Sequence, residues 1–384
     1  MGNGTPFSFG GRNSTSVWRS ILVRLLVIGT LPTVELSTLT HAADHSLTQT
    51  RFNELQLIAS HNSFKQAIDP PLLEMMLTLS AKAAALDYSH VSLTEQLNLG
   101  LRGLEIDIVN DPDGGLYAHP LGLKMLQQLK AEAQPYDTQA MLNPGFKVMH
   151  VPDFDFRSNQ PTLAGVLAEL RAWSIANPGH LPIFISSNLT DTAAPAPGAV
   201  QPAPFDQQSL DLLDQALREG LGADRLITPD MVRREHPTLR QAILADGWPL
   251  TQRLLGKFMW VLDAKQQKRL LYTKGHPSLR GRVMFTLAPP ESDEAAVLFI
   301  NNPLNNEARI RKLVDLGYFV RTRADSATRE ARTGDTRRFE AALKSRAQVI
   351  STDYYRPDPR FKIGYQVQFD DGSYYRRLPL YDSD

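Results

Sequence analysis

The chain has 384 residues, enough for one large domain or two smaller ones. Lys plus Arg and Asp plus Glu number 41 each, so the overall charge gives no argument for binding nucleic acid or an anionic membrane. The absence of cysteine excludes disulfides, thiol catalysis and thiolate metal sites, and leaves oxygen and imidazole as the available metal ligands.

The N-terminus has the features of a secretory signal. Arginines between positions 12 and 24 precede a short apolar run at 25–31, and the small residues Ala42 and Ala43 follow it. The run is too short to span a bilayer. We therefore predict that residues 1–43 are a signal peptide and that the mature protein is secreted or periplasmic. A disordered leader is the alternative interpretation.

From residue 50 onward, apolar runs alternate with segments of helical periodicity. This alternation favours an α/β fold of the (β/α)8 TIM-barrel type, made irregular by an extra strand-like run at 297–301. An open, doubly wound sheet is the alternative. The predicted strands are 55–60, 103–109, 146–151, 181–187, 257–262, 282–287, 318–323 and 348–353. The predicted helices are 162–176, 205–221, 239–256, 306–316 and 336–345.

Long loops interrupt this rhythm at 111–144 and 192–204. Both would lie on the C-terminal face of a barrel, where active sites are built from the loops that follow the strands. The apolar run 72–77, in the loop after the first strand, is a candidate lipid contact near the mouth. Such a run is more often a packed amphipathic helix than a lipid anchor.

The tail at 361–381 alternates apolar and polar residues around Asp371-Gly372, which predicts a β-hairpin outside the barrel. We therefore expect three parts in the chain. They are the leader at 1–43, a catalytic barrel at 50–357 and a C-terminal extension at 358–384.

An acidic pair marks the second predicted strand. Side chains alternate along a strand, so Glu105 and Asp107 share one face. Leu104, Ile106 and Ile108 lie on the other face. Two neighbouring carboxylates are costly to bury unless they are paired or hold a metal, and a divalent cation would relieve both the desolvation and the repulsion. The alternative is an exposed strand end.

Polar groups end four consecutive predicted strands. A single histidine of this kind is more often a satisfied core residue than a catalyst, but coincidence across adjacent strands is less expected. On a barrel these side chains would converge on one cup at the mouth. The groups are His61-Asn62, Glu105 with Asp107, His150 and Asn188.

The ordered set of these residues resembles a known family. His61-Asn62-Ser63-Phe64, then Glu105-Ile106-Asp107, then His150 before a helix resemble the catalytic X region of phosphatidylinositol-specific phospholipase C. The likeness is strongest to the calcium-dependent bacterial branch of this phosphodiesterase superfamily, and it spans residues 52–357. Further matching stretches are 146–158, 320–325 and 350–354.

The resemblance implies roles for individual residues. Asn62, Glu105 and Asp107 would hold Ca²⁺, a hard cation that prefers oxygen ligands. The metal would bind a phosphate oxygen and the inositol 2-hydroxyl, with Glu105 as candidate base. His61 would stabilise charge in the transition state, and His150 would protonate the departing diacylglycerol oxygen. The products would be diacylglycerol and a cyclic inositol phosphate.

The chain departs from the family at the fourth strand. The family usually has an acidic metal ligand where this chain has Asn188, and the loss of one negative charge should weaken calcium affinity. Asp191 is the alternative ligand if the loop turns back. His119 lies in a similar-looking stretch and rivals His150 as general acid, but His150 ends a strand and precedes a helix, as the family's second histidine does.

Two arginines share a face at the end of the 318–323 strand. Arg321 and Arg323 are candidates to bind phosphate or inositol hydroxyls, and an ion-paired rim is the alternative.

These features predict a secreted, calcium-dependent phosphodiesterase that cleaves phosphatidylinositol. One alternative is a glycerophosphodiester phosphodiesterase on the same barrel, although that family usually begins with His-Arg-Gly where this chain has His61-Asn62-Ser63. Another is a catalytically silent lipid- or carbohydrate-binding relative, made plausible by Asn188. We expect a phosphoinositide or related phosphodiester substrate, Ca²⁺ as cofactor, transient contact with a membrane surface, no nucleic acid and a monomeric state.

Overall fold

The computed structural model describes residues 45–264 and 266–379, so the predicted leader lies outside the described residues. The described residues belong to one compact unit, and none of their helices is long and apolar enough to cross a bilayer. The strands are β1 (Leu55–Ser60), β2 (Gly103–Glu105), β3 (Ile108–Val109), β4 (Lys147–Val148), β5 (Ile183–Thr190), β6 (Leu226–Ile227), β7 (Phe258–Asp263), β8 (Phe285–Thr286), β9 (Val297–Phe299), β10 (Phe319–Arg323), β11 (Val349–Thr352) and β12 (Tyr375–Arg377). The α-helices are α1 (His45–Thr48), α2 (Pro70–Leu79), α3 (Leu93–Asn98), α4 (Leu121–Gln128), α5 (Thr138–Leu142), α6 (Leu163–Ala176), α7 (Gln207–Leu221), α8 (Pro229–Arg233), α9 (Leu239–Ala245), α10 (Gln266–Thr273), α11 (Glu307–Asp315), α12 (Arg329–Thr333) and α13 (Arg337–Lys344).

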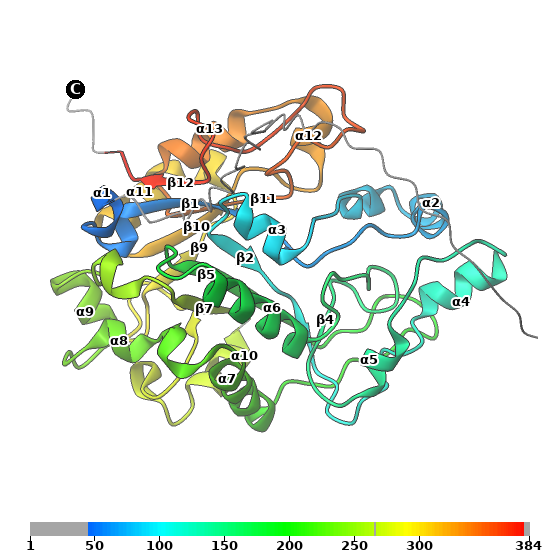
Figure 1. Cartoon of the computed structure of the whole chain (residues 1–384), viewed down its shortest axis with the longest axis horizontal. Helices are drawn as coiled ribbons and strands as arrows, with labels where there is room; N and C mark the ends of the chain where they lie inside the picture. The colour runs from blue at the N-terminus through cyan, green and yellow to red at the C-terminus, as the bar shows by residue number, and fades with distance from the viewer. Residues whose placement is uncertain (1–44, 265, 380–384) are drawn as a thin grey trace, which may run out of the picture. The chain divides into compact units, whose positions relative to one another are not determined.

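Parallel strands with helices around them form an irregular barrel (Figure 1). The strands follow one another in the order β8, β7, β5, β2, β1, β11, β10 and β9, and each neighbouring pair is parallel. No ladder joins β8 to β9 among the described residues; a single parallel bridge links Leu287 to Val297. The predicted TIM-type architecture is therefore confirmed, with one weak seam.

The identity of one barrel strand differs from the prediction. The run predicted at 146–151 forms only the short strand β4, which pairs antiparallel with β3 and stays outside the barrel order. The run at 297–301, predicted as an extra, supplies the barrel strand β9 between β8 and β10. Both runs are apolar and short, so their hydrophobic pattern did not reveal which one would find parallel partners.

The barrel interior and the helix layer share one large hydrophobic core. Its strands read as continuous apolar runs because both of their faces are covered. Phe184 of β5 stacks on Phe319 of β10 across the interior, with ring centroids 5.8 Å apart. The two longest helices, α6 and α7, begin at the capping residues Thr162 and Asp206, whose side chains accept hydrogen bonds from backbone amides of the first turn.

A second group of elements lies beside the barrel, on the right of Figure 1, and consists of α2, α4, α5 and β4. Apolar side chains of α2, α4 and α5 form, together with Phe156, a separate hydrophobic cluster that includes Leu72, Leu126 and Met141. The apolar run at 72–77 thus belongs to a packed helix whose Leu72 is buried, while Leu79 at its end is 77% exposed. The long loop predicted at 111–144 builds most of this group.

The C-terminal segment returns to the start of the barrel. The chain turns at Asp371-Gly372 as predicted, with the amide of Gly372 donating to the carbonyl of Phe369. The strand after the turn, β12, then pairs antiparallel with β1. The turn of the predicted hairpin is therefore present, but the strand that follows it pairs with β1, which is distant in sequence. The backbone groups of Leu55–Leu57 at the start of β1 are available for this pairing.

Candidate active site

Three of the four polar groups predicted to converge lie where barrel strands end. The fourth, His150, follows β4 outside the barrel order, and its charge interacts with that of Asp107. His61 follows β1, Glu105 ends β2 and Asn188 lies near the end of β5. The structure adds Asp263 at the end of β7 and Asp353 after β11. Because the barrel strands are parallel, these ends face one rim of the barrel.

His61 belongs to a buried cluster with an acid and an arginine. Its Nδ1 lies 2.7 Å from Oδ1 of Asp353, and its Nε2 lies 2.9 Å from Nη1 of Arg323. Arg323 also donates to Oδ2 of Asp353 at 3.0 Å. Burial and then the charge of Arg323 lower the pKa of His61, although Asp353 acts in the opposite direction. The ring is therefore neutral near pH 7, with Nδ1–H donating to the carboxylate and Nε2 accepting from the guanidinium.

His150 has a partner of the same kind but different surroundings. Its Nδ1 lies 2.7 Å from Oδ2 of Asp155, whose other oxygen is 3.0 Å from Nζ of Lys65. Burial is the largest single cause and would lower the pKa of His150, but the hydrogen bond to Asp155 and the charges of Asp155 and Asp107 together raise it above its ordinary value. The side chain remains 23% exposed while Asp155 is fully buried. The ring can thus carry a proton toward the mouth.

Glu105 faces a guanidinium. Arg321 donates to its Oε2 at 2.5 Å and also reaches Asn301 and Ser351 at 3.0 Å. Burial is the largest single cause and would raise the pKa of Glu105, but the charges of Arg321, His61 and Arg323 together lower it. Both predicted phosphate-binding arginines, Arg321 and Arg323, are thus paired with carboxylates in the barrel mouth, which was the alternative interpretation of the pair.

Two further carboxylates accompany Glu105. Asp107 is 1% exposed, and its Oδ1 finds no hydrogen-bond partner among the described residues. Burial and then the Glu105 charge raise the pKa of Asp107 well above its ordinary value. The same two causes raise the pKa of Asp263 to about 6. Three carboxyl groups therefore lie near this rim, and the negative charge of Glu105 disfavours ionisation of Asp107 and Asp263. Arg321 forms an ion pair with Glu105.

The two predicted asparagine ligands lie in different environments. Asn62 is buried with φ +50° and donates from Nδ2 to the hydroxyl of Tyr88 at 2.7 Å. Asn188 is exposed and pairs in register with Asp263 across β5 and β7. Asp191, the alternative to Asn188, forms an ion pair with Lys268 at 2.8 Å.

Asp263 and Asp353 are candidate site residues that the sequence interpretation missed. Asp353 is the last residue of the predicted strand 348–353. Asp263 directly follows the predicted strand 257–262, so the rule that selected polar groups at strand ends would have found it. The rival histidine, His119, is exposed on the loop that precedes α4. His150, in contrast, has a buried carboxylate partner in Asp155.

The donor set of this rim suits a hard divalent cation. The candidate ligands offer only oxygen, and the buried, unpartnered Oδ1 of Asp107 lacks the partner that a buried polar atom normally has. Within the described residues, however, no three His, Asp or Glu side chains are close enough together to hold a metal. Glu105 would have to exchange Arg321 for the metal.

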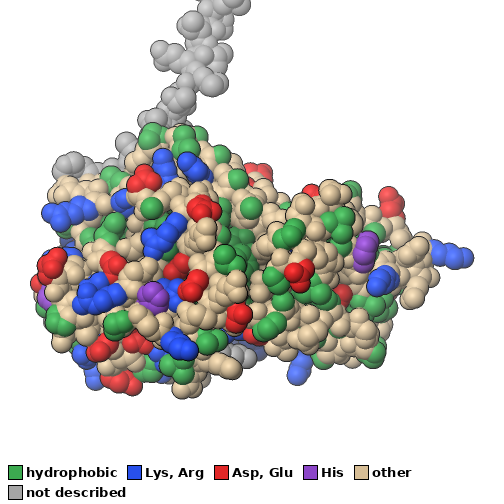
Figure 2. Space-filling model, turned by 90° about the horizontal axis from the view of Figure 1, so that it is seen from below, with side chains coloured by type: hydrophobic (Ala, Val, Ile, Leu, Met, Phe, Trp, Pro, Cys, Tyr) green, Lys and Arg blue, Asp and Glu red, His purple; other side chains and the backbone are tan. Residues whose placement is uncertain are grey.

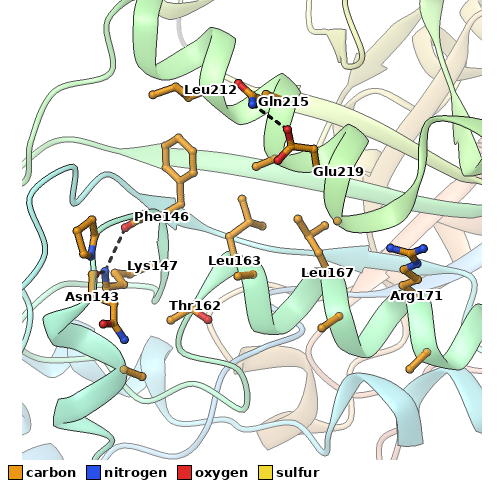
Figure 3. A pocket seen from close by; sticks show the side chains of 18 of the residues that line it. Asn143, Phe146, Lys147, Thr162, Leu163, Leu167, Arg171, Leu212, Gln215 and Glu219 are labelled. Atoms are coloured by element: carbon orange, nitrogen blue, oxygen red, sulfur yellow. Dashed lines mark hydrogen bonds between the residues drawn. The ribbon is translucent and has the colours of Figure 1, made fainter.

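A large surface groove lies elsewhere. It has a volume of about 990 Å³ and runs between α6 and α7, where Phe146, Leu163, Leu167 and Leu212 face one another (Figure 3). Figure 2 shows hydrophobic side chains gathered in a band on the face seen from below. None of the histidines or carboxylates described above lines this groove. The groove is therefore separate from the candidate active site.

Comparisons with known proteins agree on one family. The family profile described as "Phosphoinositide phospholipase C, Ca2+-dependent" matches residues 50–379. A calcium-dependent phosphoinositol-specific phospholipase C of a Pseudomonas species, in complex with myo-inositol, superposes with a TM-score of 0.55 at 16% identity, covering 87% of this chain and 97% of that one. The enzyme of Streptomyces antibioticus superposes with a TM-score of 0.50 at 16% identity, covering 80% and 95%. No curated protein is significantly similar to the chain.

Proposed function

Since the chain belongs to the calcium-dependent phosphoinositide phospholipase C family, we propose that it cleaves phosphatidylinositol to diacylglycerol and a cyclic inositol phosphate. The observation that carries this proposal is the pair of histidines His61 and His150. Each is hydrogen-bonded to a buried aspartate, and the pKa of His61 is lowered whereas that of His150 is raised. One neutral and one protonated imidazole suit a reaction that needs charge stabilisation at phosphorus and a proton for the leaving group.

His150 is the proposed general acid. Its raised pKa favours the protonated ring, and the hydrogen bond from Nδ1 to Asp155 leaves Nε2 as the donor toward the substrate. In the proposed reaction, Nε2 gives its proton to the diacylglycerol oxygen as the bond to phosphorus breaks.

His61 and Arg323 are proposed to act together at the phosphate. Because the pKa of His61 is lowered, the permanent positive charge beside it belongs to Arg323. Asp353 fixes the orientation of both groups through one oxygen each. Charge stabilisation, expected of His61 alone from the sequence, is thus assigned to the His61–Arg323 pair.

Asn62, Glu105, Asp107 and Asn188 are the proposed calcium ligands, and Asp263 joins them. Asp263 is a carboxylate in register with the neutral Asn188, so it restores the acidic charge that the fourth strand lacks. Bound calcium would lower the pKa of the inositol 2-hydroxyl and neutralise phosphate charge. Glu105 is the proposed base for that hydroxyl, a role that requires it to leave Arg321.

Export and transient contact with a membrane surface are part of the proposal. The features of residues 1–43 support export, and a lipid substrate requires the mouth to reach a bilayer. A monomeric state is proposed as well.

A direct assay tests the proposal. Vesicles of phosphatidylinositol and soluble glycerophosphoinositol are each incubated with the protein in calcium or in a chelator, with the His150→Ala variant as the inactive control. We expect diacylglycerol release from the vesicles only in calcium. Cleavage of glycerophosphoinositol alone would indicate a glycerophosphodiesterase, and no cleavage of either would indicate a silent relative.

A further inference from the structure

A fully buried lysine lies behind the proposed general acid. The side chains of Lys65 and Asp155 are both 0% exposed, and Nζ lies 3.0 Å from Oδ1 of the carboxylate. The second oxygen of Asp155 is the one that bonds His150, at 2.7 Å. One carboxylate is therefore shared between an ammonium group and the imidazole.

Lys65 is fixed by other contacts as well. Its Nζ donates to the carbonyl of Tyr88 at 2.9 Å and to that of Gln66 at 3.2 Å, and it lies 4.8 Å from the centre of the Tyr88 ring. The Tyr88 hydroxyl lies 3.3 Å from Nδ1 of His61. Lys65 and Tyr88 thus form a buried connection between the two histidine–aspartate pairs.

Stability alone does not account for this lysine. Burying an ammonium group carries a large desolvation penalty, and the attraction within a buried ion pair often does no more than offset this penalty. A well-packed apolar side chain would fill the same space at lower cost. The arrangement does, however, fix the direction of the carboxylate that orients His150.

We propose that Lys65 is a positioning residue for the general acid. It holds Asp155 so that the Nε2–H of His150 points into the mouth, and it shares the carboxylate charge so that His150 can release its proton. This inference rests on the proposed function, in which His150 protonates the leaving group.

The charges that face His150 give the sign of the expected effect. Asp155 and Asp107 raise its pKa and Lys65 lowers it, against the background of burial. Replacing Lys65 by an apolar residue removes the one positive charge in this set. The pKa of His150 should therefore rise, and a weaker acid donates its proton less readily.

The test compares Lys65→Met and Lys65→Arg with a matched control, Lys147→Met. Lys147 is also a buried lysine, but its Nζ lies 3.1 Å from Asp111 and donates to the carbonyls of Asn143 and Gly145. Activity is measured on phosphatidylinositol and on an aryl ester of inositol phosphate, whose leaving group needs no proton. The His150 pKa is measured by NMR titration of the folded proteins.

We expect Lys65→Met to lose about 10- to 100-fold on phosphatidylinositol and far less on the aryl ester, because only the proton donation is impaired. Its His150 pKa should rise, while Lys65→Arg and Lys147→Met should leave it unchanged. In an Asp155→Asn background, Lys65→Met should add no further leaving-group-dependent loss.

Equal losses on both substrates, or the same selective loss in Lys147→Met, would overturn the proposal. An unchanged His150 pKa in folded Lys65→Met would do so too. If the wild-type protein proves inactive on phosphatidylinositol, the proposed function fails and the NMR comparison alone decides the coupling between Lys65 and His150.

Discussion

His61 and His150 each hydrogen-bond a buried aspartate, yet their surroundings shift their pKa values in opposite directions. Burial is the largest single cause for both rings and lowers both pKa values. At His61, Arg323 bonds the ring directly and its charge adds to the effect of burial. At His150, Lys65 reaches the ring only through Asp155, and the combined effects of Asp155 and Asp107 exceed that of burial. At the scale of single residues, the charged groups around each ring therefore set the direction of its pKa shift.

A leaving-group series separates the two roles. His150→Ala should lose about 10²- to 10⁴-fold on phosphatidylinositol and much less on an aryl ester of inositol phosphate, because a phenolate departs without a proton. His61→Ala should lose heavily on both substrates, since both need charge stabilisation at phosphorus. The measurement is kcat/KM for each substrate. Selective loss in His119→Ala in place of His150→Ala would reassign the acid to the exposed loop.

Calcium should stabilise the fold through Asp107. A cation bound between carboxylates that disfavour one another adds about 2.7 kcal/mol at a concentration one hundred times its Kd. Asp107→Asn should remove most of the gain in Tm between chelator and saturating calcium, while Asp191→Asn, whose wild-type carboxylate pairs with Lys268, should keep it. Thermal unfolding of the three proteins checks this. An identical Tm for the wild-type protein in calcium and chelator would contradict a metal site here.

The sequence identified both histidines but not their partners. Each histidine follows a short apolar run, which is a local signal. Asp353 lies 292 residues from His61 along the chain, and no local pattern connects them. The pairing of Arg321 with Glu105, 216 residues apart, was hidden for the same reason. Residue types at strand ends are readable from the sequence, whereas the ion pairs among them depend on how the barrel closes.

At the scale of elements, the close approach of β1 and β2 positions the acidic strand. A Cβ on Gly103 would overlap the Cβ of Ala59, its partner in the β1–β2 ladder. The loop after β1 adds two hydrogen bonds, in which the amide of Ser63 donates to the carbonyl of Glu105 and its Oγ accepts from the Glu105 amide. Glu105 is therefore fixed by backbone contacts on both sides of its strand.

Adding one methyl group to this contact should disturb both fold and site. Gly103→Ala should lower the free energy of unfolding by about 1–3 kcal/mol, because the strands have to move apart. The double variant Ala59→Gly with Gly103→Ala moves the Cβ to the other strand and should regain part of that loss. Urea unfolding gives the free energy of unfolding of Gly103→Ala, of Ala59→Gly and of the double variant. Simple addition of the two single effects in the double variant would mean that the two residues do not clash.

The predicted helices vary in accuracy. The helix predicted at 239–256 was too long, because α9 ends at Ala245 and the chain turns at Gly247. α6 and α7 lie within the predicted ranges 162–176 and 205–221, because their caps and periodic apolar faces are local signals. The strands were located nearly as well, but their pairing was not. β4 has two residues and β9 has three, too few for a sequence pattern to show their partners, and the three-dimensional contacts place one outside the barrel and the other within it.

At the scale of the whole molecule, two buried histidines make folding sensitive to acid. Burial lowers the pKa of His90 and of His180 to about 4. The unfolded chain binds protons on these rings near their ordinary pKa of about 6.5, whereas the folded chain binds them only near pH 4. Their contribution to stability is thus present above pH 6.5 and lost as the pH falls from there toward 4.

His180→Gln should make stability less dependent on pH. His180 lies after α6, away from the candidate active site, where its Nε2 is 2.9 Å from Oγ of Ser174. The free energy of unfolding of the wild-type protein should fall more steeply between pH 7 and pH 4.5 than that of the variant, by on the order of 2–3 kcal/mol. Urea unfolding at the two pH values measures this difference. Parallel curves would mean that His180 is protonated equally in both states.

The partners of β1 set the order in which the molecule can assemble during synthesis. β1 pairs with β11 along Leu57–Ser60 and with β12 along Leu55–Leu57, while β2 contributes a single residue pair. The side chain of Gln56 reaches residues 291 and 320 positions later in the chain. The first strand to leave the ribosome therefore waits for nearly the last, and contacts so distant in sequence form slowly. β1 therefore lacks most of its sheet partners until the last strands of the described chain have been made.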